Sequence, residues 1–503
     1  MLKLFGGGKP DHPMADPKEA RRLLEDLPPH DTVKALEELS HWFDSVSTAE
    51  GFKLEQRLQL LFQIDEAALP RARKLARDYF ASARPSRVQE NRLWKAIHEY
   101  WSQAGQAFGR AVDQFVTGAK GTDAAKAQLP LLLVRALHSL AQQIKWMHMR
   151  YGPVDLGVWG VFNRIYGFAE FRGLAGAKSV LYPGVPGETT PQLEFLKGVV
   201  FSASSPDALL PLEVDLAERL IADFTLKFTL NAAPGPDMSY WTDLNQNMAP
   251  QRLVRPPQQT PTLRCFGASA ALEEVKGHMQ KIESTRQVPA SLNLGGTYEP
   301  EAVLDVLSLL ALYWSLEPPE RKHPRHTVKS RLSVAHGYDG LLGVLGESES
   351  LDFEATAVES WIVENVSAGG FGAIVQQLKG DWLKVGSLIA MQPEGGNNWV
   401  TGIVRRVNKV GTGQARVGIQ TLSKAPLAAS FWTGVTTEKG VILKTGEPES
   451  GEVRIVLKPG VFVPGQNIES ERNSRFHVYM PQGLEDKGDD FEIARFREMI
   501  REN

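Results

Sequence analysis

Apolar residues recur at helical spacing through the first third of the chain. Leu54, Leu58 and Leu61 lie three or four positions apart, and the stretch 133–144 repeats this spacing. Asp31 follows two prolines and is a suitable cap for the first long helix. The pattern predicts a helical domain over residues 31–185, preceded by a flexible N-terminus over residues 1–30.

The pattern changes over residues 186–317. Strand-like runs at 225–231 and 262–267 precede a helical stretch on which Leu272, Val275 and Met279 share a face. A further helical stretch stops at the proline pair 318–319, because proline cannot continue a helix. We expect a mixed α+β region here, either a separate unit or an extension of the bundle.

Residues 318–424 have the two-residue period of strands. In ARVGIQ (415–420), small or apolar residues alternate with arginine, glycine and glutamine, which predicts a compact β-barrel. Residues 425–503 continue with strands such as GEVRIVLKPG, and Ile493, Phe496 and Ile500 share one helical face. We therefore expect a β-rich C-terminal segment with a terminal helix.

The predicted fold class is a multidomain α+β protein. It has an N-terminal helical bundle, an α/β middle region, a C-terminal β-barrel and a further β-rich segment. With 503 residues, the chain is long enough for several domains.

Composition narrows the classes of function. Lys and Arg number 56 against 59 Asp and Glu, a formal net charge of -3, so we expect no whole-chain affinity for nucleic acid or anionic lipid. A single cysteine, Cys265, excludes an intrachain disulfide. The apolar stretch 303–314 is shorter than the ~20 residues of a membrane span. We expect a cytoplasmic protein without membrane insertion, metal or cofactor.

The first candidate motif is RKHPR (321–325). Arg321 and Arg325 enclose Pro324 and follow a proline pair, so this segment cannot be a regular helix. Two guanidinium groups on such a linker can form bidentate contacts with phosphate oxygens or with the O6 and N7 edge of guanine. The alternative is a solvated linker that merely carries positive charge.

The second candidate motif is NVSAGG (365–370), which follows a strand-like stretch. The side-chain oxygen of Asn365 can accept a hydrogen bond from a purine N–H, and Ser367 can donate to a phosphate or cap a turn. Gly369, Gly370 and Gly372 permit a close approach of ligand to backbone. The alternative is a tight turn or bulge between barrel strands.

Together, the two motifs resemble the RxxxR and [D/N]xSxxG elements of the PilZ family of cyclic di-GMP receptors, in the family's order. The resemblance covers about residues 319–424 and includes strand-like WLKVGSLIAM (382–391) and WVTGIVRRV (399–407). It implies that Arg321 and Arg325 bind the phosphate and guanine groups of the ligand. It also implies that Asn365, Ser367 and Gly370 form the floor of a cyclic di-GMP site.

The resemblance further implies a bacterial receptor in which the ligand closes the linker onto the barrel and changes the orientation of the domains. The output would be contact with a protein partner in motility, adhesion or biofilm control. The chain has no GGDEF-like or EAL-like signature, so we expect a receptor and not an enzyme. The alternative is a scaffold or adaptor with a purely structural barrel and a partner-binding helical domain.

Overall fold

A computed structural model of the chain describes residues 10–501 apart from 82–85, 256, 318, 320–322, 347–357, 412, 444–450 and 473. The chain divides into two compact units. The first unit contains the residues up to 319, without two short segments. Those segments, residues 151–153 and 207–210, belong with the residues from 320 onward in the second unit.

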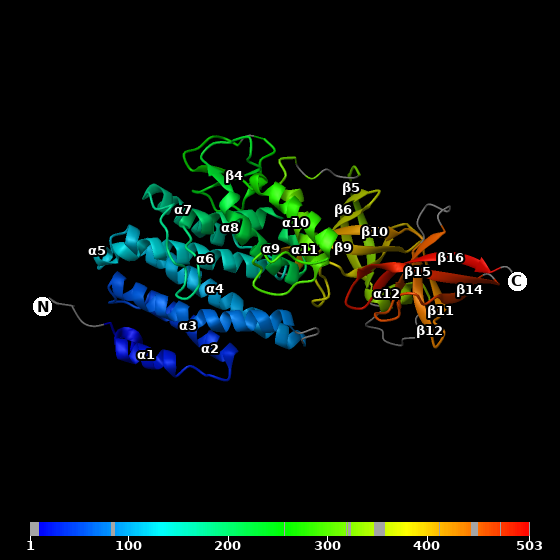
Figure 1. Ribbon diagram of the computed structural model, residues 1–503, viewed down its shortest axis with the longest axis horizontal. Coiled ribbons are helices and arrows are strands. Elements are labelled where there is room, and N and C mark those ends of the chain that lie inside the picture. The colour runs from blue at the N-terminus through cyan, green and yellow to red at the C-terminus, as the bar shows by residue number, and fades with distance from the viewer. Residues whose placement is uncertain are drawn as a thin grey trace. The chain divides into compact units, whose positions relative to one another are not determined.

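The first unit is built on long helices that run alongside one another (Figure 1). At its centre, α4 (Arg87–Val116) packs against α2 (Thr32–Thr48), α3 (Leu54–Ala81) and α6 (Leu129–His148). The Asp31 side chain accepts a hydrogen bond from the backbone of Lys34 at the start of α2, which confirms the predicted cap. Further helices are α1 (Pro17–Glu25), α5 (Thr122–Ala125), α7 (Leu156–Phe171), α8 (Pro191–Ala203), α9 (Pro211–Phe224), α10 (Leu272–Thr285) and α11 (Pro300–Trp314).

The N-terminal segment differs from the expectation of flexibility. Asp16 caps α1 with bonds to two backbone amides, and Met14, Ala20 and Leu27 are buried. These three apolar contacts were missed because the segment is short and carries little periodic signal. Residues 1–9 lie outside the described part of the chain.

The middle region belongs to the same compact unit as the bundle. Its small sheet has the strand order β1-β4-β2-β3, and α10 and α11 pack together beside α9. The strands are β1 (Thr229–Asn231), β2 (Tyr240–Asp243), β3 (Gln251–Arg252) and β4 (Leu263–Gly267).

A buried polar stripe runs along α6. The Arg135 guanidinium lies 2.5 Å from an Asp65 carboxylate oxygen, and Tyr100 donates to the other oxygen of Asp65 at 2.7 Å. Lys145 lies 2.6 Å from Asp215, further along the helix. Because an unpaired buried charge is costly, these pairs hold α3 and α9 against α6. The stripe consists of buried Arg135 and Lys145 and of half-buried His138 and Gln142 between them.

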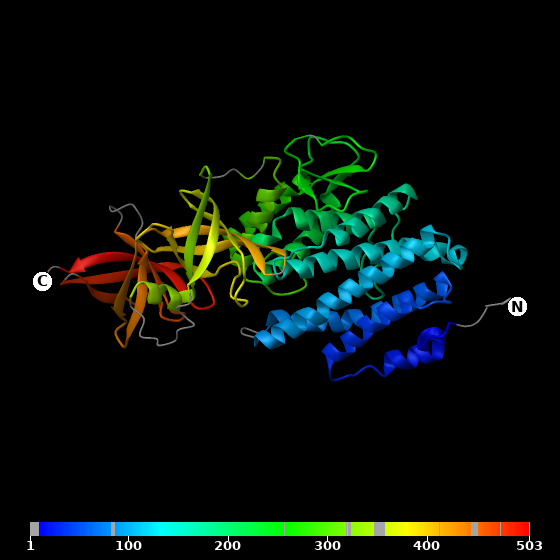
Figure 2. The same ribbon diagram turned by 180° about the vertical axis from the view of Figure 1, so that it is seen from behind.

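The second unit contains two barrels (Figure 2). The first is a closed antiparallel barrel with the strand order β10-β7-β6-β5-β8-β9, which confirms the predicted barrel. Its interior is filled by apolar side chains such as Leu332, Trp361 and Val404. The strands are β5 (His326–His336), β6 (Glu359–Ser367), β7 (Gly370–Val375), β8 (Leu388–Pro393), β9 (Val400–Gly411) and β10 (Gln414–Ser423).

The C-terminal segment forms a second closed barrel, with the order β11-β12-β13-β16-β15-β14. A short helix, α12 (Gly337–Val344), contributes Tyr338 and Leu341 to an apolar cluster that includes residues of both barrels. The strands are β11 (Pro426–Trp432), β12 (Thr437–Leu443), β13 (Glu452–Leu457), β14 (Ile468–Arg472), β15 (Arg475–Lys487) and β16 (Glu492–Arg501).

The predicted terminal helix is wrong, because the segment forms strand β16. It pairs with β13 on one side and with β15 on the other, and exposed Arg495 and Arg497 flank buried Phe496 with the period of a strand. Pairing on both sides outweighs the helical spacing of Ile493, Phe496 and Ile500. Among the described helices, none is long and apolar enough to cross a membrane.

Replacing Asp65 by alanine is expected to lower the free energy of unfolding by about 3–5 kcal/mol, because Arg135 would stay buried without its nearest carboxylate. The matched control is Asp123→Ala, which removes the acid of an exposed pair with Lys126 and should cost less than about 0.5 kcal/mol. Urea unfolding of the full chain, followed by the helical circular-dichroism signal, measures both. Equal effects of the two substitutions would contradict the role assigned to the stripe.

Acid is expected to destabilise the first unit through Glu194 and Asp215. Burial alone would raise the pKa of Glu194, but Lys197 and His138 outweigh it and lower this pKa from 4.5 to about 2. Lys145 and Arg219 likewise outweigh burial and lower the pKa of Asp215 from 3.8 to about 2. Both folded-state pKa values lie below the unfolded ones, so the stabilisation is complete above the unfolded values and is lost as pH falls towards about 2.

Unfolding free energies of the full chain measured at descending pH test this expectation. The Glu194→Gln variant should lose less stability between neutral and acid pH than the unsubstituted protein, whereas the exposed Glu273→Gln control should follow the unsubstituted protein. An unchanged acid slope in Glu194→Gln would show that this carboxylate does not carry the effect.

Candidate functional site

The two predicted motifs meet at one end of the first barrel. Strand β5 begins directly after Arg325, and its first residues lie opposite β6, with Thr327 opposite Asn365. Arg325 is exposed, and its position in the chain places it beside the end of β6 at Ser367. Within the described residues, Arg325 forms no ion pair. Arg321, the other arginine of the motif, lies outside the described residues.

The turn between β6 and β7 is a two-residue hairpin loop. Ser367 and Gly370 are opposite each other, and the Ser367 hydroxyl donates to the carbonyl of Gly370 at 3.3 Å. A Cβ atom at Gly369 would lie 3.0 Å from Cδ2 of His323, so the His323 ring lies against this turn. The linker therefore touches the hairpin at a residue between the two predicted arginines.

Two glycines allow neighbouring groups to approach the backbone of β7 closely. A Cβ atom at Gly370 would lie 1.9 Å from the Ile419 carbonyl oxygen of β10, a distance that no side chain can accept. A Cβ atom at Gly372 would lie 2.6 Å from the side-chain nitrogen of Asn365. Gly370 is thus required by strand packing, while Gly372 leaves space for the Asn365 amide.

The Asn365 amide lies on the outer face of the barrel. Its neighbour across the sheet is Gly372, and the flanking residues Phe371 and Ala373 pack on the interior. Among the described residues, the Asn365 side chain forms no hydrogen bond, so both its carbonyl and its amino group can serve a ligand. A register shift between Val363 and Asn365 marks a bulge at this point.

A continuous row of residues crosses five strands on this outer face. Each is the register partner of the next, and the two glycines in the middle present backbone only. The row runs Thr327, Asn365, Gly372, Gly418 and Arg406. The two glycines of this row, together with Gly370 two residues before Gly372 on β7, are called the glycine floor.

Exposed arginines border the glycine floor on its far side. Arg405 donates to the side-chain oxygen of Gln420 at 2.8 Å, and Gln420 is the register partner of Gly370. Arg406 lies 3.3 Å from an Asp207 carboxylate, in a segment that belongs to the same unit. Arg416 faces Glu364 at 3.7 Å. Guanidinium groups can bind an anion that carries planar rings, through hydrogen bonds to the anion and stacking on the rings.

The structure brings four of the five predicted site residues to one place: Arg325, Asn365, Ser367 and Gly370. Sequence reasoning missed Gly418 and the bordering arginines. A signal was present, because Arg416, Gly418 and Gln420 alternate with the core residues of β10 and so must face outward. Arg405 escapes that rule because a bulge at this point turns Arg405 and Arg406 outward together.

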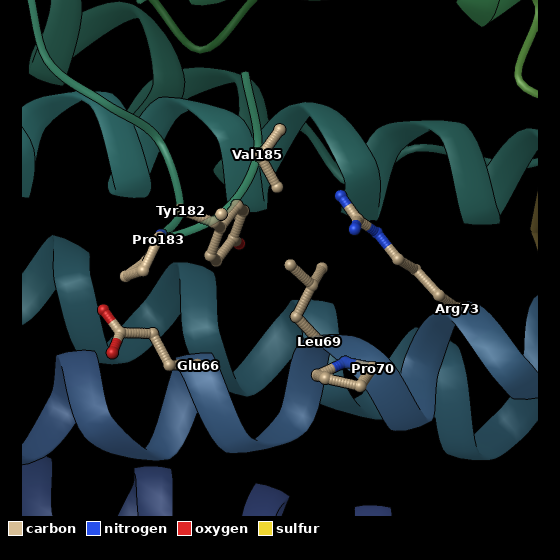
Figure 3. Close-up of a pocket in the computed structure, with 8 residues that line it drawn as sticks. Glu66, Leu69, Pro70, Arg73, Tyr182, Pro183 and Val185 are labelled. Atoms are coloured by element: carbon tan, nitrogen blue, oxygen red, sulfur yellow. The ribbon is translucent and has the colours of Figure 1, made fainter. Parts of the chain in front are cut away.

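A separate hollow lies in the first unit. It has a volume of about 320 Å³ and is lined by α3 on one side and by the segment 182–185 on the other. Leu69 and Arg73 extend from α3 towards Tyr182 and Val185 (Figure 3). Tyr182 stacks on the Arg135 guanidinium, whose charge lies 4.0 Å from the ring centre. This hollow therefore adjoins the buried stripe of α6.

Part of the helical region is similar to a known protein family. Residues 18–235 match a family described as the N-terminal domain of the cyclic-di-GMP receptor FimW. The match falls on the helical region and includes neither barrel, so the PilZ resemblance of residues 319–424 stays a prediction. No curated protein matches the chain. Sequence reasoning assigned no ligand-related role to the helical region, where this match lies.

A methyl group at Gly370 is expected to destabilise the barrel more than one at Gly372. At position 370 it meets the rigid backbone of β10, which costs about 1–3 kcal/mol. At position 372 it meets a side chain that can rotate away, so Gly372→Ala should cost less than about 1 kcal/mol. Chemical unfolding of the two full-length variants measures the difference. A greater loss of unfolding free energy in Gly372→Ala than in Gly370→Ala would show that strand packing is not the reason for the glycine at position 370.

Proposed function

We propose that the chain is a cyclic di-GMP receptor that binds its ligand on the outer face of the first barrel. The observation that carries the proposal is the meeting of Arg325, Asn365 and Ser367 over the glycine floor. The similarity of residues 18–235 to a cyclic-di-GMP receptor family supports the same ligand from a different part of the chain.

The chemistry of the ligand fits the charges of the site. Cyclic di-GMP carries two phosphates and two guanine rings. Arg325 and Arg321 can each form charge-assisted, bidentate hydrogen bonds with a phosphate or with the O6 and N7 edge of guanine. Arg405, on the far side of the floor, adds a further cation. The binding site thus gathers positive charge on a chain whose overall charge is slightly negative.

Asn365 and the glycine floor would select the base. The Asn365 carbonyl can accept from the guanine N–H groups, and Ser367 adds a hydroxyl at the edge of the hairpin. Because Gly372 has no side chain, the Asn365 amide lies over the strand backbone, where a purine ring could contact it. A pyrimidine would cover less of this surface and would lack the N7 acceptor.

Ligand binding would draw the linker onto the barrel. The linker connects the first unit to the second, so its ordering changes how freely the two units reorient. His323 already contacts the hairpin and provides a point from which the linker can close. We propose that the new orientation regulates a protein partner in motility, adhesion or biofilm control.

The proposed role is that of a receptor and not of an enzyme. The residues that surround the glycine floor supply hydrogen bonds and positive charge, which bind a phosphodiester without cleaving it. A receptor needs only a difference in ligand affinity between two states of the protein.

Full-length protein is expected to bind cyclic di-GMP selectively over GTP and cyclic di-AMP in isothermal titration. Arg325→Ala and Asn365→Ala should each weaken binding by about tenfold or more, the loss of a hydrogen bond to a charged or buried group. The matched control is Arg331→Ala, which removes an exposed arginine from β5, the strand that follows Arg325, away from the hairpin. It should bind like the unsubstituted protein.

Absence of binding at about 100 μM ligand would overturn the proposal, because a dissociation constant above this concentration is too weak for a signalling receptor. The adaptor hypothesis would then take its place, with the hollow between α3 and the segment 182–185 as the first surface to examine. Equal weakening by Arg325→Ala and Arg331→Ala would show a general effect of charge and would contradict the site.

A further inference from the structure

We propose that the second barrel competes with the ligand for Arg405 and thereby tunes the affinity of the cyclic di-GMP site. Asp486, on β15 of the second barrel, is the competing group. This inference rests on the proposed function and adds a regulatory element from outside the two motifs.

Arg405 lies within reach of the glycine floor. Its guanidinium donates to Gln420, the register partner of Gly370, and neighbouring strands are about 4.8 Å apart. The bulge in β9 turns Arg405 to the outer face although Val404 before it is buried in the core. A phosphate at the edge of the floor, beside exposed Gln420, would therefore lie within reach of the Arg405 guanidinium.

Asp486 holds the same guanidinium. The distance from Nη2 of Arg405 to Oδ2 of Asp486 is 3.0 Å, so a single arginine bridges the glutamine beside the floor and the second barrel. The arginine side chain is 46% exposed and the aspartate 29%, which leaves the pair open to an anion from solution. A phosphate and the Asp486 carboxylate are both anions and bind the same donor groups.

Among the described residues, Asp486 is one of three acids of the β15–β16 hairpin with polar contacts to the first barrel or α12, and Phe491 and Ile493 add apolar contacts. Asp489 forms an ion pair with Lys384, and Asp490 accepts a hydrogen bond from the backbone of Tyr338 at 2.8 Å. Loss of the Asp486 contact would leave the other two in place. Ligand binding would thus loosen one edge of the hairpin without separating the barrels.

Because of this competition, ligand binding and the contact of Asp486 with Arg405 weaken each other by the same free energy. If the ligand displaces Asp486, removal of Asp486 must tighten ligand binding by the same amount of free energy. An ion pair of this exposure corresponds to an affinity gain of about threefold for Asp486→Asn. Asp489→Asn provides a matched control, because it removes a charge from the same hairpin but pairs with Lys384 and not with Arg405.

The test is isothermal titration with cyclic di-GMP of the full-length protein and four variants: Asp486→Asn, Asp489→Asn, Arg405→Ala and the double variant Asp486→Asn/Arg405→Ala. We expect tighter binding in Asp486→Asn, a change below about 1.5-fold in Asp489→Asn, and weakening of about tenfold in Arg405→Ala. The double variant should bind like Arg405→Ala alone, because Asp486 acts through that arginine.

Three outcomes would overturn the inference, and they are distinguishable. No binding by the unsubstituted protein removes the proposed function and this inference with it. If the unsubstituted protein binds the ligand and Asp486→Asn and Asp489→Asn have equal affinities, the proposed receptor function stands and only the competition is excluded. An equal gain from Asp486→Asn with and without Arg405 shows a long-range charge effect and likewise excludes the competition.

Discussion

Position 370 has no room for a side chain, and this constraint organises the candidate site. The backbone of β7 approaches that of β10 so closely that a Cβ atom would lie 1.9 Å from the Ile419 carbonyl oxygen. The approach closes the barrel at the end where the β6–β7 hairpin turns, which sets Ser367 and Asn365 beside the start of β5. The constraint at position 370 therefore fixes the place of the hairpin residues on which the proposed site depends.

Much of this barrel could be predicted from local pattern. Alternation in residues 415–420 predicts which side chains face the interior, and the glycines of residues 369–372 predict a tight hairpin. The roles of Arg405 and Asp486 could not be predicted. A bulge interrupts the alternation at Arg405, and its partner lies 81 positions away on another barrel. The local periodicity of the sequence predicts neither the bulge nor the pairing with Asp486.

The helical region shows the same division between local pattern and long-range pairing. Leucine spacing predicts α3 and α6, but polar residues three and four positions apart on α6 are typical of a solvated face. The face is instead buried because α3 and α9 supply carboxylates to Arg135 and Lys145. At the C-terminus, the spacing of apolar residues fits a helix as well as a strand, and pairing with β13 and β15 decides between them.

The arginines that border the glycine floor are already paired with acids of the chain: Arg405 with Asp486, Arg406 with Asp207, and Arg416 with Glu364. In the proposed receptor, an anionic ligand would exchange one set of ion pairs for another, and its affinity would be the difference between the two. Such a site binds less tightly than one with free cations. Asp207 and Asp486 lie in segments outside the two motifs, whereas Glu364 directly precedes Asn365 on β6. In the proposed receptor, displacement of Asp207 or Asp486 would transmit ligand occupancy as a change in contacts. Arg325, which has no such partner within the described residues, would supply the affinity that these exchanges do not.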